Sequence, residues 1–90
     1  MNRLAVRNSF KKDLKRTTKR GHDRALLEAV VDQLRQGREL PQARRDHSLK
    51  GEWKHWRECH IAPNWLLIYR VTEDEVLLAR TGTHADLFGM

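Results

Sequence analysis

The spacing of apolar residues changes once along the chain, from a helical period in the first half to strand-like runs in the second. A short apolar segment at 4–6 predicts a first strand, and two amphipathic helices are predicted between 8 and 21 and between 23 and 37. Their apolar stripes are Phe10, Leu14 and Thr17 in the first, and Leu26, Leu27, Val30, Val31 and Leu34 in the second. The charged segment 44–48 has the composition of a surface loop.

The helix boundaries are predicted from capping residues. Asn8 or Ser9 is suited to cap the first helix and Asp23 the second, because their short side chains accept hydrogen bonds from free backbone N–H groups. Gly21 and Gly37 are placed to end the two helices, where a left-handed residue commonly follows the last turn.

Three antiparallel strands are predicted after Gly51. The segment 53–61 mixes aromatic and polar residues, 65–71 is a nearly continuous apolar run typical of a central strand, and 76–79 returns as a third strand. Turn signals separate these strands at 62–64 and 72–75.

The order of these elements predicts an α+β fold. An N-terminal strand and a helical hairpin would pack on one face of a twisted, mainly antiparallel sheet of about four strands. Ninety residues form one small core, and the sequence has no repeat or low-complexity segment, so 1–90 is expected to be a single domain.

The net charge of the chain indicates which class of partner it binds. Eighteen Lys and Arg against twelve Asp and Glu give a net charge of +6, concentrated in the N-terminal half, which indicates an anionic partner or, alternatively, a solvated basic face. Nucleic acid is favoured over a membrane because no run approaches the roughly 18 apolar residues of a spanning helix. With no signal peptide pattern and a lone Cys59, which is most simply a buried apolar side chain, we expect a cytoplasmic protein.

Residues able to do chemistry near neutral pH gather in two segments, 46–69 and 80–84. These segments hold four of the five histidines, among them the candidate site residues His47, His60 and His84, and all three tryptophans. Three histidines can also bind zinc, but the chain lacks paired cysteines and regular ligand spacing, so we expect no metal and no cofactor.

The same segments resemble a known family. The residues of this chain that carry the resemblance are Asp46-His47, Leu49-x-Gly51-x-Trp53, Arg57, His60, Trp65-x-Leu67-Ile68-Tyr69, Arg80-Thr81-Gly82-Thr83-His84 and Leu87-Phe88-Gly89. This order is similar to the YafQ branch of the RelE/ParE superfamily of bacterial toxins, and the match is densest from 46 to 89. The resemblance implies a RelE-like fold and a small basic toxin of a type II toxin–antitoxin system, a ribosome-dependent endoribonuclease that a cognate antitoxin sequesters.

Such an enzyme, cutting RNA without a metal, must deprotonate a 2′-hydroxyl, neutralise the phosphate and protonate the leaving 5′-oxygen. The resemblance implies that His84 is the acid, that His60 with His47 serves the base side, and that Arg80 is the cation at the phosphate. Asn64 departs from the family pattern, which has an aspartate after the proline of this turn. An amide cannot take a proton, so the base role is expected to shift to His60 or His47, with Asn64 orienting a neighbour.

Substrate contacts are expected on two surfaces. The exposed face of the first helix offers the cations that would contact RNA, Lys11, Lys12, Lys15 and Arg16. Phe88 is a candidate to stack on an mRNA base, and Trp65 either packs in the core or borders the site.

Three functions remain open at this point. The first is a nuclease that binds the ribosome and mRNA and is held by an antitoxin with an acidic toxin-binding segment. The second is a non-catalytic ParE-like inhibitor of DNA gyrase, and the third is an RNA-binding homologue with weakened activity. The histidine set favours the nuclease, because a pure binder has no need of it.

Overall fold

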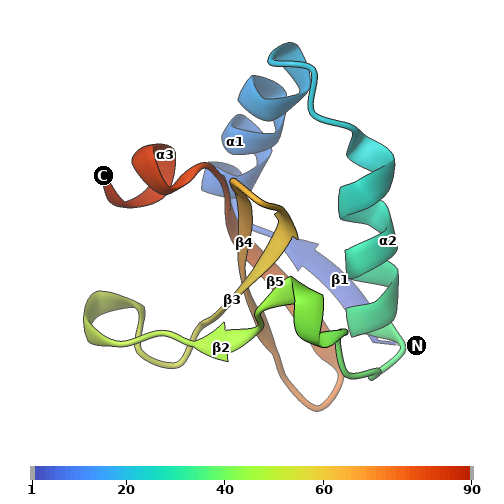
Figure 1. The fold of residues 1–90 in the computed structure, drawn as a ribbon. Coiled ribbons are helices and arrows are strands. Elements are labelled where there is room, and N and C mark those ends of the chain that lie inside the picture. Colours follow the sequence, from blue (N-terminus) through green and yellow to red (C-terminus); the bar gives the residue numbers. More distant parts are fainter. Residues whose placement is uncertain (1, 90) are drawn as a thin grey trace.

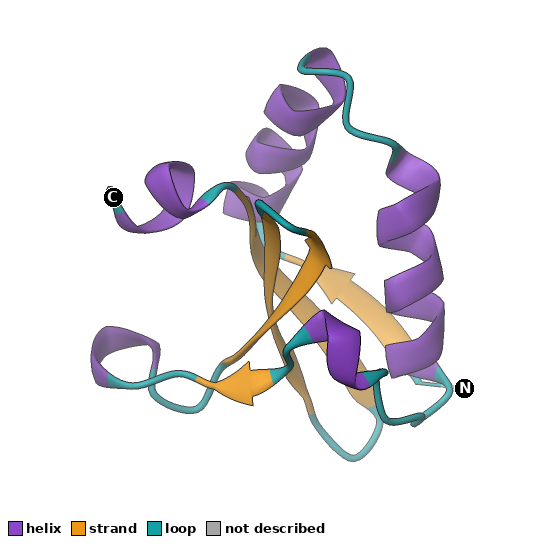
Figure 2. Cartoon of the chain, in the orientation of Figure 1, coloured by secondary structure: helices purple, strands orange, loops and turns teal. Residues whose placement is uncertain are grey.

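The computed structural model describes residues 2–89, and a first strand, two helices and a run of strands follow one another largely as predicted (Figures 1 and 2). They are β1 (Arg3–Val6), α1 (Asn8–Lys19), α2 (Arg24–Arg35), β2 (His47–Ser48), β3 (Arg57–Ala62), β4 (Trp65–Val71), β5 (Glu75–Gly82) and α3 (His84–Phe88), with short 3-10 helices at Gln42–Arg44 and Gly51–Trp53. No helix within this part of the chain is both long and apolar enough to span a bilayer.

One sheet holds all the strands, in the order β1-β5-β4-β3-β2. β1 runs parallel to β5, and the other neighbours are antiparallel. The apolar run of β4 lies at the centre, where both faces are covered, and its first five residues are buried. The α+β fold and the mainly antiparallel sheet are confirmed.

The sheet has five strands and not about four, because β2 was predicted as surface loop. His47 and Ser48 pair with Glu58 and Arg57 of β3. Because both residues are polar and exposed, the sequence shows no alternation of apolar and polar positions that would predict a strand here. Their strand conformation depends on pairing with β3. The third predicted strand is also longer than its apolar core, since β5 continues through the polar residues Arg80 and Thr81 to Gly82.

α1 and α2 lie on one face of the sheet and diverge from the turn that joins them (Figure 1). Their buried residues form one cluster with alternate residues of the central strands. The cluster contains Phe10, Leu27, Val30, Val31, Leu34, Cys59, Ile61, Trp65, Leu67, Tyr69, Val76 and Leu78. Burial of apolar surface in this layer, at about 25 cal/mol per Å², is the main stabilising contribution to such a domain.

The N-terminal caps agree with the sequence at α2 and differ at α1. Asp23 caps α2 by accepting a hydrogen bond from the Ala25 N–H. At α1 the N-cap is Arg7, without a side-chain cap, and the Ser9 hydroxyl donates to the Ala79 carbonyl at 2.8 Å. The predicted cap at Asn8 or Ser9 was therefore wrong, because Ser9 bonds to β5. Leu26 was also misplaced in the apolar stripe, since it is 41% exposed.

Trp65 belongs to the core. Its side chain is 2% exposed, and its indole N–H donates to the Thr81 hydroxyl at 2.9 Å. The ring of His22 packs edge-to-face with that of Trp65, with the centroids 4.8 Å apart. Of the two alternatives for Trp65, packing is correct, and its face is not available for stacking on a base.

Candidate active site

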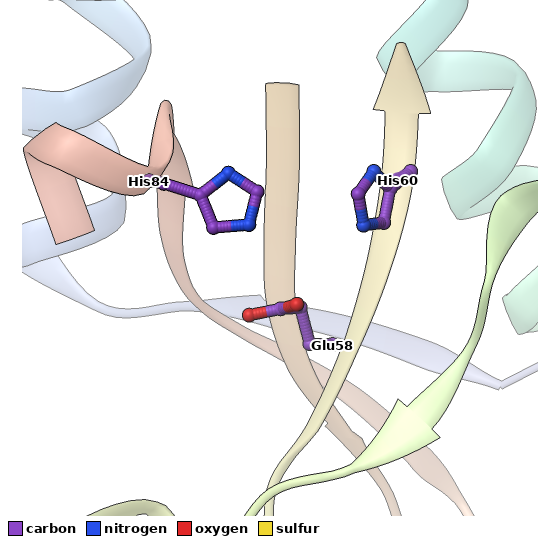
Figure 3. A group of neighbouring side chains, drawn as sticks. All are labelled: Glu58, His60 and His84. Atoms are coloured by element: carbon purple, nitrogen blue, oxygen red, sulfur yellow. The ribbon is translucent and has the colours of Figure 1, made fainter. Parts of the chain in front are cut away.

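Glu58, His60 and His84 converge on the sheet face opposite the helices (Figure 3). Glu58 and His60 lie two residues apart on β3, so both side chains point to the same side of the sheet, away from Cys59 and Ile61. His84 comes from the start of α3. Its ring centroid is 6.0 Å from that of His60, and each of the three side chains offers a polar atom within 4.8 Å of the others.

His84 is held in place by the turn that starts α3. The Thr83 hydroxyl accepts from the Asp86 N–H at 3.1 Å, and the Asp86 carboxylate accepts from the Thr83 N–H at 3.0 Å. Gly82 has φ of +153°, and a Cβ there would lie 2.9 Å from Asp86, so only glycine permits this close approach. Gly82 and Thr83 thus fix the backbone at His84, the first residue of α3, and with it the starting point of the imidazole side chain.

Asp86 also ties α3 to α1. Its Oδ2 lies 2.6 Å from Nη1 of Arg20, and its Oδ1 lies 3.9 Å from Nε of Arg16. The hydrogen bond from Arg20, followed by the one from the Thr83 N–H, holds the pKa of Asp86 well below its usual range. The helix that carries His84 is therefore anchored by charge at its first turn.

His47 joins the cluster through Glu58. Its Nε2 lies 3.2 Å from Oε1 of the Glu58 carboxylate, which is buried, whereas His47 itself is half exposed. The pairing of β2 with β3 sets His47 directly opposite Glu58, which brings the two side chains together.

Asn64 lies in the turn between β3 and β4, at the rim of the cluster. Its amide oxygen is 3.4 Å from Nδ1 of His84, a long hydrogen bond. Through this contact the Asn64 amide can orient the ring of His84.

Arg80 lies in the same row of the sheet as Glu58, since both pair with Ile68. Its guanidinium forms a two-point ion pair with the buried Asp13 of α1, with Nε to Oδ2 at 2.5 Å and Nη2 to Oδ1 at 3.2 Å. These hydrogen bonds raise the pKa of Arg80 above its already high ordinary value. The predicted cation is thus fixed, and charged at any physiological pH.

The predicted RNA contacts on α1 separate into two groups. Lys11, Lys12 and Lys15 are exposed. Arg16 is not a free surface cation, because its Nη2 donates to Asp13 at 2.9 Å. Phe88 is partly buried in the last turn of α3, four residues after His84, so both side chains belong to one short helix.

Sequence reasoning missed two acids, Glu58 and Asp13. The strand pattern contained a signal for Glu58, since residues 58 and 60 share a face in any strand through 53–61. Asp13 had a weaker signal, because the helical period places it beside Phe10 and Thr17 on the buried face. Neither acid was singled out as a candidate site residue from the sequence.

The donor set of the cluster also suits a transition metal. One carboxylate and two imidazoles are ligands that copper and zinc accept, although atoms up to 4.8 Å apart must approach one another to share one ion. Glu58, His60 and His84 would hold the ion, and it would occupy the lone pairs that acid–base chemistry needs.

Comparisons with known proteins agree with this fold. The family model described as the bacterial toxin of type II toxin–antitoxin system, YafQ, matches residues 2–89. The mRNA interferase toxin YafQ of Escherichia coli K12 is 41% identical over 81 residues, which cover 89% of this chain and 88% of that protein.

Two solved structures extend the likeness to the backbone. A copper-bound mutant toxin from Helicobacter pylori superposes with a TM-score of 0.92 at 42% identity, covering 98% of this chain and 100% of the other. The Escherichia coli DinJ–YafQ toxin–antitoxin complex contains a chain with a TM-score of 0.89 at 37% identity, covering 98% of each chain.

Proposed function

The chain belongs to the YafQ family of bacterial type II toxins, and on that premise we propose that it is an endoribonuclease that cleaves mRNA on the ribosome without a metal. The observation that supports the proposal most directly is the convergence of Glu58, His60 and His84 on one sheet face, with Arg80 in the same row of the sheet as Glu58. The relative from Escherichia coli is named an mRNA interferase, which is consistent with this chemistry.

The proposed reaction is transfer of the phosphate to the neighbouring 2′-hydroxyl with loss of the 5′-oxygen. A base takes the 2′-hydroxyl proton, the oxygen attacks phosphorus, Arg80 stabilises the phosphate charge and His84 protonates the leaving oxygen. His84 suits the acid role because it stands on the far side of the cluster from His47 and is oriented by Asn64 and by the α3 capping turn.

The base side is assigned to His60, with Glu58 and His47 supporting it. Glu58 supplies a carboxylate within the cluster, which compensates for the amide at Asn64. A buried carboxylate beside an imidazole stabilises the cation that forms when the imidazole takes a proton. His47 completes the arrangement by holding Glu58 from the solvent side.

The two alternative functions, a gyrase inhibitor and an RNA-binding homologue with weakened activity, place different demands on the residues of the cluster. A gyrase inhibitor needs a binding face but no acid and base at a fixed separation. An inactive homologue would need no carboxylate in the cluster, and Glu58 is present. Both observations favour the nuclease.

The proposed partners are anionic. Lys11, Lys12 and Lys15 form an exposed basic surface on α1, which we assign to ribosomal RNA, while mRNA enters between His60 and His84 and Phe88 stacks on a base. The site of action would be the cytoplasm.

A cognate antitoxin with an acidic toxin-binding segment would cover part of the basic surface. DinJ forms a toxin–antitoxin complex with YafQ in Escherichia coli. The binding of the antitoxin to this chain should weaken with salt.

The test is inducible expression of the wild type and of His84→Ala, with the 5′ ends of cellular mRNA mapped. The wild type should arrest growth and produce new 5′ ends within translated frames. His84→Ala should lose about 10²–10⁴-fold in cleavage rate while still sedimenting with ribosomes, because a positioned acid contributes to the transition state and little to binding.

His55→Ala is the matched control, since His55 is exposed and lies outside the cluster. It should cut at the wild-type rate. DNA breaks at gyrase sites without new mRNA ends would instead favour the inhibitor, and growth arrest without either would favour inert binding.

A further inference from the structure

Asp13 is a buried acid that the reaction described above does not use. It lies on α1 and is 3% exposed, and four donors surround its carboxylate. They are Nε and Nη2 of Arg80, the Thr81 N–H at 3.2 Å from Oδ2, and Nη2 of Arg16 at 2.9 Å from Oδ1. A carboxylate costs several kcal/mol to bury, so this position is unusual for a helix whose remaining buried residues are Phe10 and Thr17.

Asp13 contacts one edge of the Arg80 guanidinium and leaves the opposite edge without a partner from Asp13. The group has five N–H donors, and Asp13 takes those of Nε and one of Nη2. Within residues 2–89 the Nη1 group of Arg80 donates to no acceptor, and the Arg80 side chain is 25% exposed. The remaining Nη1 and Nη2 donors form the fork that binds two phosphate oxygens at once.

Sheet register explains why orientation matters here. Arg80 starts from the row that contains Ile68 and Glu58, so its long side chain can turn toward the cluster or away from it. Asp13, anchored by the Thr81 N–H of the adjacent residue, restricts both the direction and the plane of the guanidinium. A free arginine loses rotamer entropy when substrate fixes it, whereas this ion pair fixes Arg80 before substrate arrives.

We infer that Asp13 is a positioning residue, which holds the Arg80 guanidinium side-on so that its free edge meets the scissile phosphate. The inference rests on the proposed nuclease function. A structural role for Asp13 through its other contacts, the Thr81 N–H and Arg16, is the competing explanation, and it predicts that loss of Asp13 harms the protein whether or not Arg80 is present.

A double-mutant cycle separates the two explanations. Single-turnover cleavage on programmed ribosomes would be measured for wild type, Asp13→Asn, Arg80→Ala and the double variant, with thermal unfolding recorded for each. We expect Asp13→Asn alone to lower the rate by about 10²-fold, the scale of a misplaced catalytic group. In the Arg80→Ala background the same change should alter the rate by less than about twofold. Equal losses in both backgrounds would overturn the inference.

A chemical rescue gives a second readout that fold stability does not move. Millimolar guanidinium ion should restore part of the activity of Arg80→Ala, because Asp13 and the Thr81 N–H remain to orient it. The rescue should disappear in Arg80→Ala with Asp13→Asn. If guanidinium rescues both variants equally, Asp13 does not position the cation.

Two further variants keep the test decisive. Asp13→Glu retains the charge and displaces the carboxylate by one methylene, so it can replace Asp13→Asn in the cycle if that variant does not fold. Asp32→Asn is the matched control, since Asp32 is an exposed acid on α2 and should leave the rate unchanged. A wild-type protein that fails to cut would refute the proposed function, whereas a cutting enzyme with independent losses would refute only the role of Asp13.

Discussion

The amide oxygen of Asn64 lies 3.4 Å from Nδ1 of His84, across the open rim of the histidine cluster. An amide oxygen orients the ring but adds no charge, whereas a carboxylate at the same place would favour the protonated imidazole. Asn64 therefore lies where a carboxylate could orient His84, but its amide carries no negative charge.

Asn64→Asp should extend activity toward alkaline pH. If His84 is the acid, its protonated form persists to higher pH beside a carboxylate, and the alkaline limb of the rate profile should move up by about one pH unit. Single-turnover rates from pH 5 to 9 measure this. Asn64→Ala is the control without an acceptor and should lower the rate. Superimposable profiles for wild type and Asn64→Asp would remove this contact from the mechanism.

Replacing Lys11, Lys12 and Lys15 by Gln should weaken ribosome association and flatten its dependence on salt. These side chains are exposed, so the fold should be retained, and each lost phosphate contact lowers the slope of log K against log salt by about one. Arg16 is left in place because it pairs with Asp13. Arg3, Arg24 and Arg38, replaced by Gln together, remove the same charge elsewhere. Equal weakening by both triple variants would show that only net charge matters.

Cleavage should continue when transition metals are removed and should stop when copper is added. A chelator selective for transition metals, used with Mg²⁺ retained for the ribosome, should leave the rate unchanged. Added Cu²⁺ should inhibit, because an ion held by Glu58, His60 and His84 takes the lone pairs that proton transfer requires. His60→Ala should reduce copper binding measured by calorimetry, and His55→Ala should not. Loss of activity on chelation would contradict the metal-free mechanism.

Asp86→Ala should destabilise the protein most at neutral pH and least in acid. The folded pKa of Asp86 is lowered by Arg20 and the Thr83 N–H, so its contribution is complete above the unfolded value of about 3.9 and is lost as pH falls below it. Loss of the helix cap alone is worth about 0.5–2 kcal/mol. Denaturant unfolding at pH 7 and pH 3 would show the difference. Asp74→Ala, at an exposed turn, should change neither value much.

Cys59 should resist alkylation until the protein unfolds. The residue is fully buried, and that burial, reinforced by Asp46, raises the pKa of the thiol to about 12. The thiolate is the reactive form, so iodoacetamide at pH 8 should label the native chain no faster than it unfolds. Mass spectrometry of intact protein with and without urea measures this. Rapid labelling of the native state would mean that β3 opens locally.

Sequence alone determined the elements whose period is strong. The apolar run 65–71 became β4 with those boundaries, and the cap at Asp23 and the glycine ends of both helices were also found. Each of these features is decided within a few residues, by alternation, by capping or by a left-handed backbone position. The candidate site histidines were singled out because their types and spacing resemble those of a family.

Only the tertiary structure decided which charges belong to the site. β2 exists because β3 lies beside it, and this pairing brings His47 to Glu58. Asp13 and Arg80 are 67 residues apart in sequence, and no local pattern records that α1 packs over β5. A charged residue in a sequence looks solvated until its partner is known, because burial of an acid becomes tolerable only when the fold supplies the donors.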